Sequence, residues 1–131
     1  MKKILLPIVA LAAFLGTSCT SEVAVNSKTN PVATYDSFTG TFTGYIDGTA
    51  PKIFMATQIA AEKNLGYFRT GIRDDTNKFK LRCRTATDKP VMVTVTQKDI
   101  DLVEVEIDFD GGDQMQSQIF FNEIVKAKSG M

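Results

Sequence analysis

Residues 78–110 read KFKLRCRTATDKPVMVTVTQKDIDLVEVEIDFD, and this stretch decides the fold. It holds three runs in which apolar and polar residues alternate, a pattern typical of strands that bury only one face. In the run 78–85 the apolar residues are Phe79, Leu81 and Cys83, and the positions between and beside them carry Lys or Arg. The runs 91–97 and 101–110 alternate in the same way. We therefore predict three neighbouring strands of a one-sided sheet.

Two more strands are predicted on the N-terminal side. Residues 65–73 form one, and the polar segment 74–77 links it to the strand that begins at residue 78. Residues 37–46 form the other, with Phe38, Phe42 and Ile46 on one side. Gly40 and Gly44 in that run allow a bulge or a close neighbour. The short polar links 74–77, 86–90 and 98–99 predict hairpins, so the four strands that they join should be antiparallel.

Two helices complete the pattern. Thr49 is expected to cap the first, with Pro51 in its first turn and Gly66 at its end. Asp113 is expected to cap the second, whose apolar stripe is Met115, Ile119, Phe120, Ile124 and Ala127. The order β-α-β-β-β-β-α predicts an α+β domain of two layers, with a mostly antiparallel five-stranded sheet and both helices on one face. The other face should meet water.

The first 18 residues have the features of a signal peptide. Lys2 and Lys3 precede an apolar run over residues 4–15, which is too short to span a bilayer stably. Small residues then lead to Cys19, as in a bacterial lipoprotein box, although Leu15 stands four residues before Cys19, where the usual pattern has it three before. We expect lipid on Cys19. A secreted soluble protein with a free N-terminal cysteine is the alternative.

A lipidated Cys19 would anchor the chain to a bilayer. Thr20 follows it, and by analogy with Gram-negative sorting this predicts the outer membrane, facing the periplasm. Residues 19–36 are expected to be a lipidated N-terminus and flexible tether, and residues 37–128 the domain. Cys83 would then be the one cysteine of that domain, which leaves it no internal disulfide and predicts a buried thiol.

Composition excludes several functions. The chain contains no histidine, so Ser-His-Asp and Cys-His catalysis are excluded. Lys+Arg and Asp+Glu are both 15, and no aromatic platform accompanies the cations, so we expect no nucleic-acid partner. Residues 108–113 fail the EF-hand pattern, since Asp113 stands where glycine is required. We expect no catalytic residue, no metal and no cofactor.

The charged residues fall on the face that should meet water. The cations there are Arg69, Arg73, Lys78, Lys80, Arg82 and Arg84. Glu104, Glu106 and Asp108 should form an acidic row two strands away. Two interpretations stay open: a solvated face whose charges prevent edge pairing, or a patch that binds an envelope protein or an anionic envelope component.

The stretch from residue 34 to residue 128 resembles a family of small bacterial lipoproteins known as a domain of unknown function. The shared features are FTGTFTGY at 38–45, an Ala-rich helix ending near NLG at 64–66, KFKLRCR at 78–84 and VMVTV at 91–95. Gly112, Asp113 and Ser117 match a final motif of the type Gly-Asp-x-x-x-Ser-x-x-Ile, in which Phe120 replaces the isoleucine. The resemblance implies a lipoprotein with an α+β domain and no catalytic residues.

These expectations favour a non-catalytic, membrane-anchored binding or assembly module of the cell envelope. The rival hypothesis is a structural or stress-related envelope lipoprotein that acts through anchoring alone.

Overall fold

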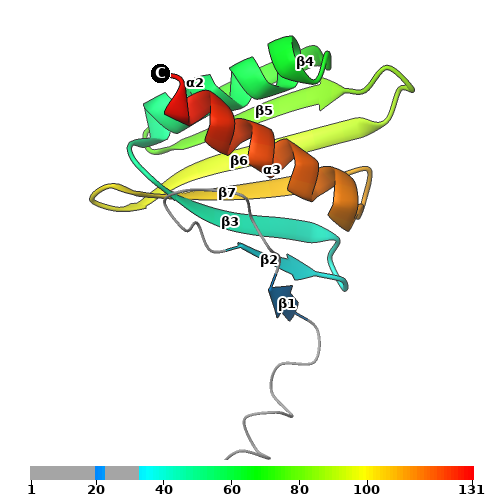
Figure 1. Ribbon diagram of the computed structural model, residues 1–131, viewed down its shortest axis with the longest axis horizontal. Helices are drawn as coiled ribbons and strands as arrows, with labels where there is room; N and C mark the ends of the chain where they lie inside the picture. Colours follow the sequence, from blue (N-terminus) through cyan, green and yellow to red (C-terminus); the bar gives the residue numbers. More distant parts are fainter. Residues whose placement is uncertain (1–19, 23–32) are drawn as a thin grey trace, which may run out of the picture.

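The computed structural model describes residues 20–22 and 33–131 as an α+β domain with one antiparallel sheet and two helical segments on one of its faces (Figure 1). The strands are β1 (Thr20–Glu22), β2 (Ala33–Asp36), β3 (Thr41–Asp47), β4 (Phe68–Asp75), β5 (Lys78–Arg84), β6 (Pro90–Asp99) and β7 (Leu102–Phe109). The helices are α2 (Ala50–Ile59), the π-helical turn η2 (Ala60–Asn64) that continues it, and α3 (Gln114–Ser129).

The strand order is β1-β2-β3-β7-β6-β5-β4, and every neighbouring pair is antiparallel. The first long strand, β3, therefore pairs with the last, β7. Helix α2 and η2 carry the chain over the sheet to its far edge at β4, and the hairpins then return strand by strand to β7 (Figure 1). This arrangement places three consecutive hairpin strands, β5, β6 and β7, in the middle of the sheet.

The prediction of five strands is wrong, because the sheet continues beyond β3. Strand β2 pairs with β3 along four residues, and the three-residue β1 pairs with β2. The side chains of Ala33 and Tyr35 are 2% and 9% exposed. The prediction of a flexible tether over 19–36 is therefore wrong for residues 20–22 and 33–36, which form strands of the sheet. Cys19, the expected signal peptide and residues 23–32 lie outside the described residues.

The core lies between the sheet and the helices. Cross-strand register places Leu81, Val93 and Ile107 in one row at the sheet centre, and all three are fully buried. The predicted alternation of β5, β6 and β7 is confirmed, and Cys83 is buried as expected. On the helix side, Phe121 packs on Phe42 with ring centroids 5.3 Å apart.

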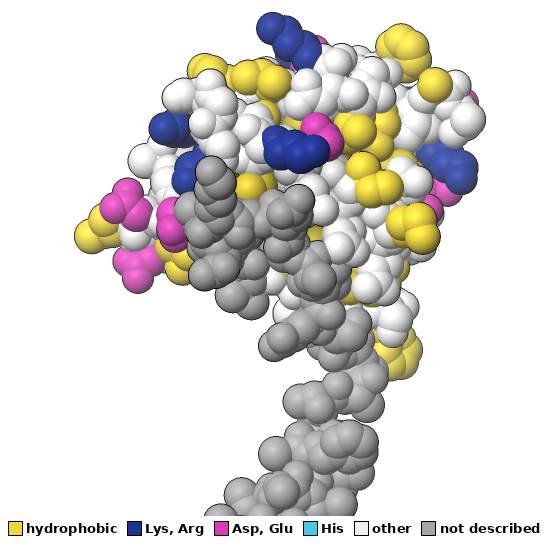
Figure 2. Space-filling model, in the orientation of Figure 1, with side chains coloured by type: hydrophobic (Ala, Val, Ile, Leu, Met, Phe, Trp, Pro, Cys, Tyr) yellow, Lys and Arg dark blue, Asp and Glu magenta, His cyan; other side chains and the backbone are white. Residues whose placement is uncertain are grey.

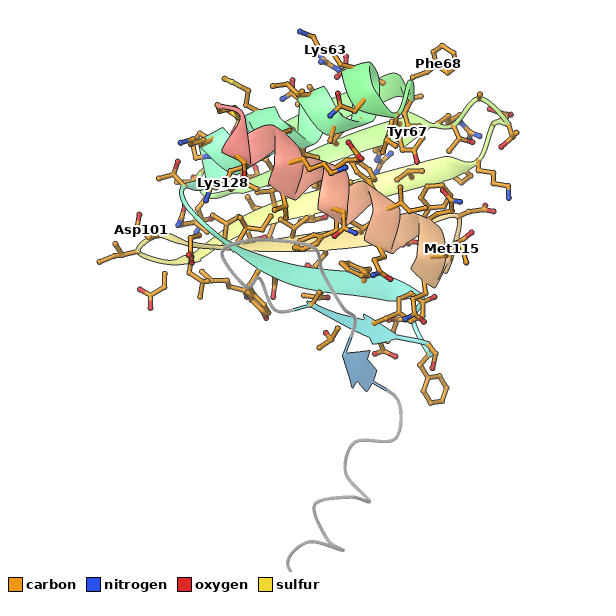
Figure 3. All side chains as sticks on the ribbon, in the orientation of Figure 1. Lys63, Tyr67, Phe68, Asp101, Met115 and Lys128 are labelled. Carbon is orange, nitrogen blue, oxygen red and sulfur yellow. The ribbon has the colours of Figure 1, made fainter. Side chains whose placement is uncertain are left out.

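Two of the predicted apolar faces, one on the strand 37–46 and one on the C-terminal helix, include residues that are in fact exposed. Phe38 is 84% exposed, because residues 37–40 form a turn closed by a 2.8 Å hydrogen bond from the Gly40 N–H to the Asp36 carbonyl. Met115 and Ile119 are also exposed, and Figure 3 shows Met115 at the start of α3. Phe120 and Ile124 are buried as predicted, and Ala127 packs against the core. The buried stripe of α3 also includes Ser117, Phe121 and Val125.

The two helix caps differ. The Asp113 carboxylate accepts a 3.0 Å hydrogen bond from the Gln116 N–H, so the predicted cap of α3 is confirmed. Thr49 occupies the cap position of α2, but its side chain makes no cap hydrogen bond. The side chain of Gln97 in β6 replaces it, accepting from the Ala50 N–H at 2.7 Å. None of the described helices has the length and apolar character required to cross a bilayer.

Candidate partner-binding site on the open face of the sheet

The face of the sheet opposite the helices carries charge sorted by strand. Strand β5 bears a basic row, β6 a neutral row and β7 an acidic row, and the register aligns them residue by residue. The three crossing lines are Lys78–Thr96–Glu104, Lys80–Thr94–Glu106 and Arg82–Met92–Asp108. We call Lys78, Lys80 and Arg82 the basic row, Thr96, Thr94 and Met92 the neutral row, and Glu104, Glu106 and Asp108 the acidic row.

The sorting follows directly from strand alternation. Successive side chains of a strand point to opposite faces, so each apolar residue of β5 in the core brings a cation to the open side. The acidic row arises in the same way from the sequence VEVEID of β7. The basic and acidic rows are two strand spacings apart, roughly 9.5 Å between backbones. The predicted acidic row, two strands from the cations, is therefore confirmed.

The central charges of this face have no ion-pair partner within the described residues. Lys80, Arg82 and Glu106 take part in none of the salt bridges there. Arg73 of β4 stands beside Lys80 in the register and adds a fourth cation. These groups can therefore form ion pairs and hydrogen bonds with a charged partner without breaking an interaction inside the domain.

Arg84 lies at the end of β5 and is partly committed to the following turn. Its guanidinium donates to the Asp88 carbonyl at 3.0 Å and lies 3.3 Å from the Asp88 carboxylate. Both side chains remain exposed, so water screens this pair. Arg84 thus stays on the open face as predicted, with less freedom to bind a partner than Arg82 has.

Arg69 does not belong to this face, and the prediction for it is wrong. The register of β4 shifts between Arg69 and Gly71, so Thr70 is an extra residue in a β-bulge. Arg69 therefore lies on the opposite face from the one that strict alternation predicts. Arg69 pairs with Cys83 on the helix side. Its guanidinium there donates to Glu62 at 2.6 Å and to Gln58 at 3.2 Å.

Glu104, at one end of the acidic row, is held by two neighbouring side chains. Glu104 accepts from the Tyr45 hydroxyl at 3.0 Å and lies 3.7 Å from Lys98 Nζ. The hydrogen bond to Glu104 raises the pKa of Tyr45, with burial and the charge of that carboxylate acting in the same direction. The Tyr45 hydroxyl therefore stays protonated and holds Glu104 in place. Glu106 is the carboxylate of this row with no such partner among the described residues.

An open depression of about 550 Å³ lies at one end of the face, between the basic and acidic rows. Its lining includes Arg82, Arg84, Met92 and Asp108. A cation and a carboxylate thus stand on the two sides of an apolar floor. Thr70, Pro90 and Gly111 also contribute, and alternation could not identify them because they lie at a bulge, a strand start and a turn.

The chemistry available elsewhere differs from that of the open face. Burial raises the pKa of the Cys83 thiol to about 11, and the thiol faces the helices. Within residues 20–22 and 33–131, no group of three or more metal-binding side chains is arranged around a common point. On the helix side, Lys and Arg side chains are dispersed among apolar and uncharged ones (Figure 2).

The fold and this face together define an α+β domain that covers one sheet face with helices and presents sorted charge on the other. The chain belongs to a family of proteins of unknown function, DUF3568, whose model matches residues 2–127. No curated protein matches it.

Proposed function

We propose that the protein is a lipid-anchored module of the cell envelope that binds a charged partner, without catalysis, through the open face of its sheet. The observation that carries the proposal is the sorted charge of β5 and β7, whose central members Lys80, Arg82 and Glu106 have no ion-pair partner in the described part of the chain. A protein or an anionic envelope component would supply the complementary groups.

The sequence before the domain supports the anchoring part of this proposal. Residues 1–18 have the pattern of a signal peptide that ends at Cys19, and acyl chains on that cysteine would hold the domain at a membrane surface. The domain itself keeps its thiol buried at Cys83, which suits an oxidising compartment.

Reversal of the free cations tests the binding part. In the variant Lys80→Glu, Arg82→Glu, a partner captured by cross-linking and pull-down from envelopes should be lost, because opposed like charges cost several kcal/mol. The matched control is Lys52→Glu, Lys63→Glu, which changes net charge equally at exposed helical positions. Retention of the same partners by both variants would refute the proposal and favour action through anchoring alone.

Substitution of Cys19 tests the anchoring part. We expect Cys19→Ala to move the protein from the membrane fraction to the soluble fraction, and mass spectrometry of the parent to show acyl chains on Cys19. The control is Cys83→Ala, which leaves the leader unchanged and should stay with membranes. A parent chain that retains residues 1–18 and carries no lipid would contradict the proposal.

A further inference from the structure

The open face is complementary to itself. The basic and acidic rows lie one strand away on either side of the neutral row of β6, at matching positions along the strands. A two-fold axis that runs along β6 in the plane of the face would exchange the two sides and keep the position along the strand. It would therefore bring the basic row of one copy onto the acidic row of another.

We propose that the partner of the open face is a second copy of this chain, stacked face to face about such an axis. This inference rests on the proposed function, because it takes the same face as the binding surface. Lys78 of each copy meets Glu104 of the other, Lys80 meets Glu106, and Arg82 meets Asp108. The symmetry repeats each contact, so the interface is isologous.

The positions around these rows are compatible with the arrangement. On the axis, the uncharged Thr94 faces its own counterpart, as do Met92 and Thr96. Two strands from the axis, β4 of one copy faces β3 of the other, which places Arg73 over Thr43. At the positions from Lys78 to Arg82 and their register partners, no like charges are opposed. Lys98 and Asp99, at the end of β6, lie near the axis and face their own counterparts, and there Lys98 is paired with Glu104 at 3.7 Å within its own copy. A two-fold axis across the strands would instead place each row on itself, with like charges opposed.

Sheet geometry permits the contact. Stacked sheets pack about 10 Å apart with their strands within about 30° of each other. A rotation of that size shifts side chains one strand from the axis by roughly 2–3 Å, as follows from the strand spacing. The long side chains of Lys80, Arg82 and Glu106 can take up this shift.

The interface is charged, so its strength depends on salt. Screening shortens the range of exposed ion pairs from about 10 Å at 0.1 M salt to about 3 Å at 1 M. A common membrane would raise the effective concentration of two anchored copies and favour association. We therefore expect a dimer at low ionic strength that dissociates at high ionic strength.

Charge exchange between the rows gives the decisive experiment. An acidic variant, Lys80→Glu, Arg82→Glu, and a basic variant, Glu106→Lys, Asp108→Lys, should each be monomeric in sedimentation velocity of the intact, detergent-solubilised chain at 50 mM salt. Their equimolar mixture should dimerise at least about ten-fold more tightly than either variant alone. Misfolding cannot produce this gain, and circular dichroism checks each variant.

A cross-link tests the position of the axis. Thr94→Cys should give a covalent dimer with a short bismaleimide, because the two introduced thiols face each other across the axis. Thr43→Cys is the matched control: it lies on β3, two strands from the axis, so its two copies are about four strand spacings apart. The parent chain, in which Cys83 is 2% exposed, gives the background.

The outcomes separate this inference from the proposed function. A monomeric parent at 50 mM salt, no rescue in the mixture, or equal cross-linking at positions 94 and 43 would overturn the self-association. If self-association is overturned but the acidic variant loses another envelope partner in the pull-down, the proposed function stands with that partner. If self-association is overturned and the variant loses no partner, both proposals fall.

Discussion

Gly44 lies directly beneath the ring of Phe121, which is fully buried on α3. A Cβ atom at this position would overlap Cε1 and Cζ of that ring. We expect Gly44→Ala to lower the free energy of unfolding by about 1–3 kcal/mol, the usual cost of overpacking a core. Urea denaturation of the variant and the parent measures this difference in the free energy of unfolding. The control is Gly71→Ala, where an added Cβ meets nothing within 4 Å; an equal loss there would contradict this account.

The Cys83 thiol makes stability depend on alkaline pH. Burial raises its pKa from 9.0 to about 11, so between these values the folded chain holds a proton that the unfolded chain has released. This contribution is complete below pH 9 and is lost as pH rises towards 11. The free energy of unfolding should then fall by up to about 1.4 kcal/mol per pH unit for this proton.

Replacement of the thiol isolates its part of that slope. Cys83→Ala should flatten the decline between pH 9 and 11, as followed by urea denaturation at stepped pH. Tyr67 and Tyr45, whose pKa values are also raised, remain in both proteins and contribute to the residual slope. An unchanged slope in the variant would mean that the thiol ionises as readily in the folded chain as in the unfolded one.

At the scale of the elements, Gln97 holds three segments together. Its Oε1 accepts from the Ala50 N–H at the start of α2, while its Nε2 donates to the carbonyls of Asp99 at 2.7 Å and Leu102 at 3.2 Å. Removal of these partners from a partly buried site costs about 1–3 kcal/mol. We expect that loss of unfolding free energy for Gln97→Ala.

Thr49→Ala is the control for Gln97. Thr49 occupies the cap position of α2, where sequence rules favour it, yet its side chain makes no cap hydrogen bond. Loss of a working threonine cap costs about 0.5–2 kcal/mol, and we expect less than that here. Thermal or urea unfolding of both variants measures the two losses of stability. A larger loss for Thr49→Ala than for Gln97→Ala would mean that Thr49, and not Gln97, caps α2.

Strand alternation predicted the elements of 78–109 and the sides on which their residues lie. It succeeded because these strands are central and bury one face continuously. It failed at β4, where a bulge between Arg69 and Gly71 places Arg69 on the opposite face from the one that strict alternation predicts. Gly71 is the local sign of this bulge, because glycine inside a strand often marks one. In α3 the stripe is displaced because Ser117, a polar residue, occupies a fully buried position. Pairing between distant strands, such as β3 with β7, leaves no local signal.

At the scale of the whole molecule, each face has its own composition. One face of the sheet and the inner sides of α2 and α3 form the core, and the other face carries the three rows. The basic, neutral and acidic rows could be predicted from strand alternation alone. Their lack of internal partners could not, because it depends on which long side chains turn towards nearby loops, as Arg84 does towards Asp88.

The boundary of the domain gives the last prediction. Strand β2 pairs Tyr35 with Phe42 and Ala33 with Gly44, so it protects the edge of β3 near the Phe42–Phe121 contact. A chain beginning at residue 33 keeps this protection, whereas a chain beginning at residue 37 exposes that edge. Loss of a buried side chain of this size alone removes about 1.5–3 kcal/mol. The shorter chain should therefore unfold at a lower urea concentration, and its free energy of unfolding should be lower by at least that amount. Equal stability of the two chains would move the domain boundary back to residue 37 and make residues 33–36 part of the tether.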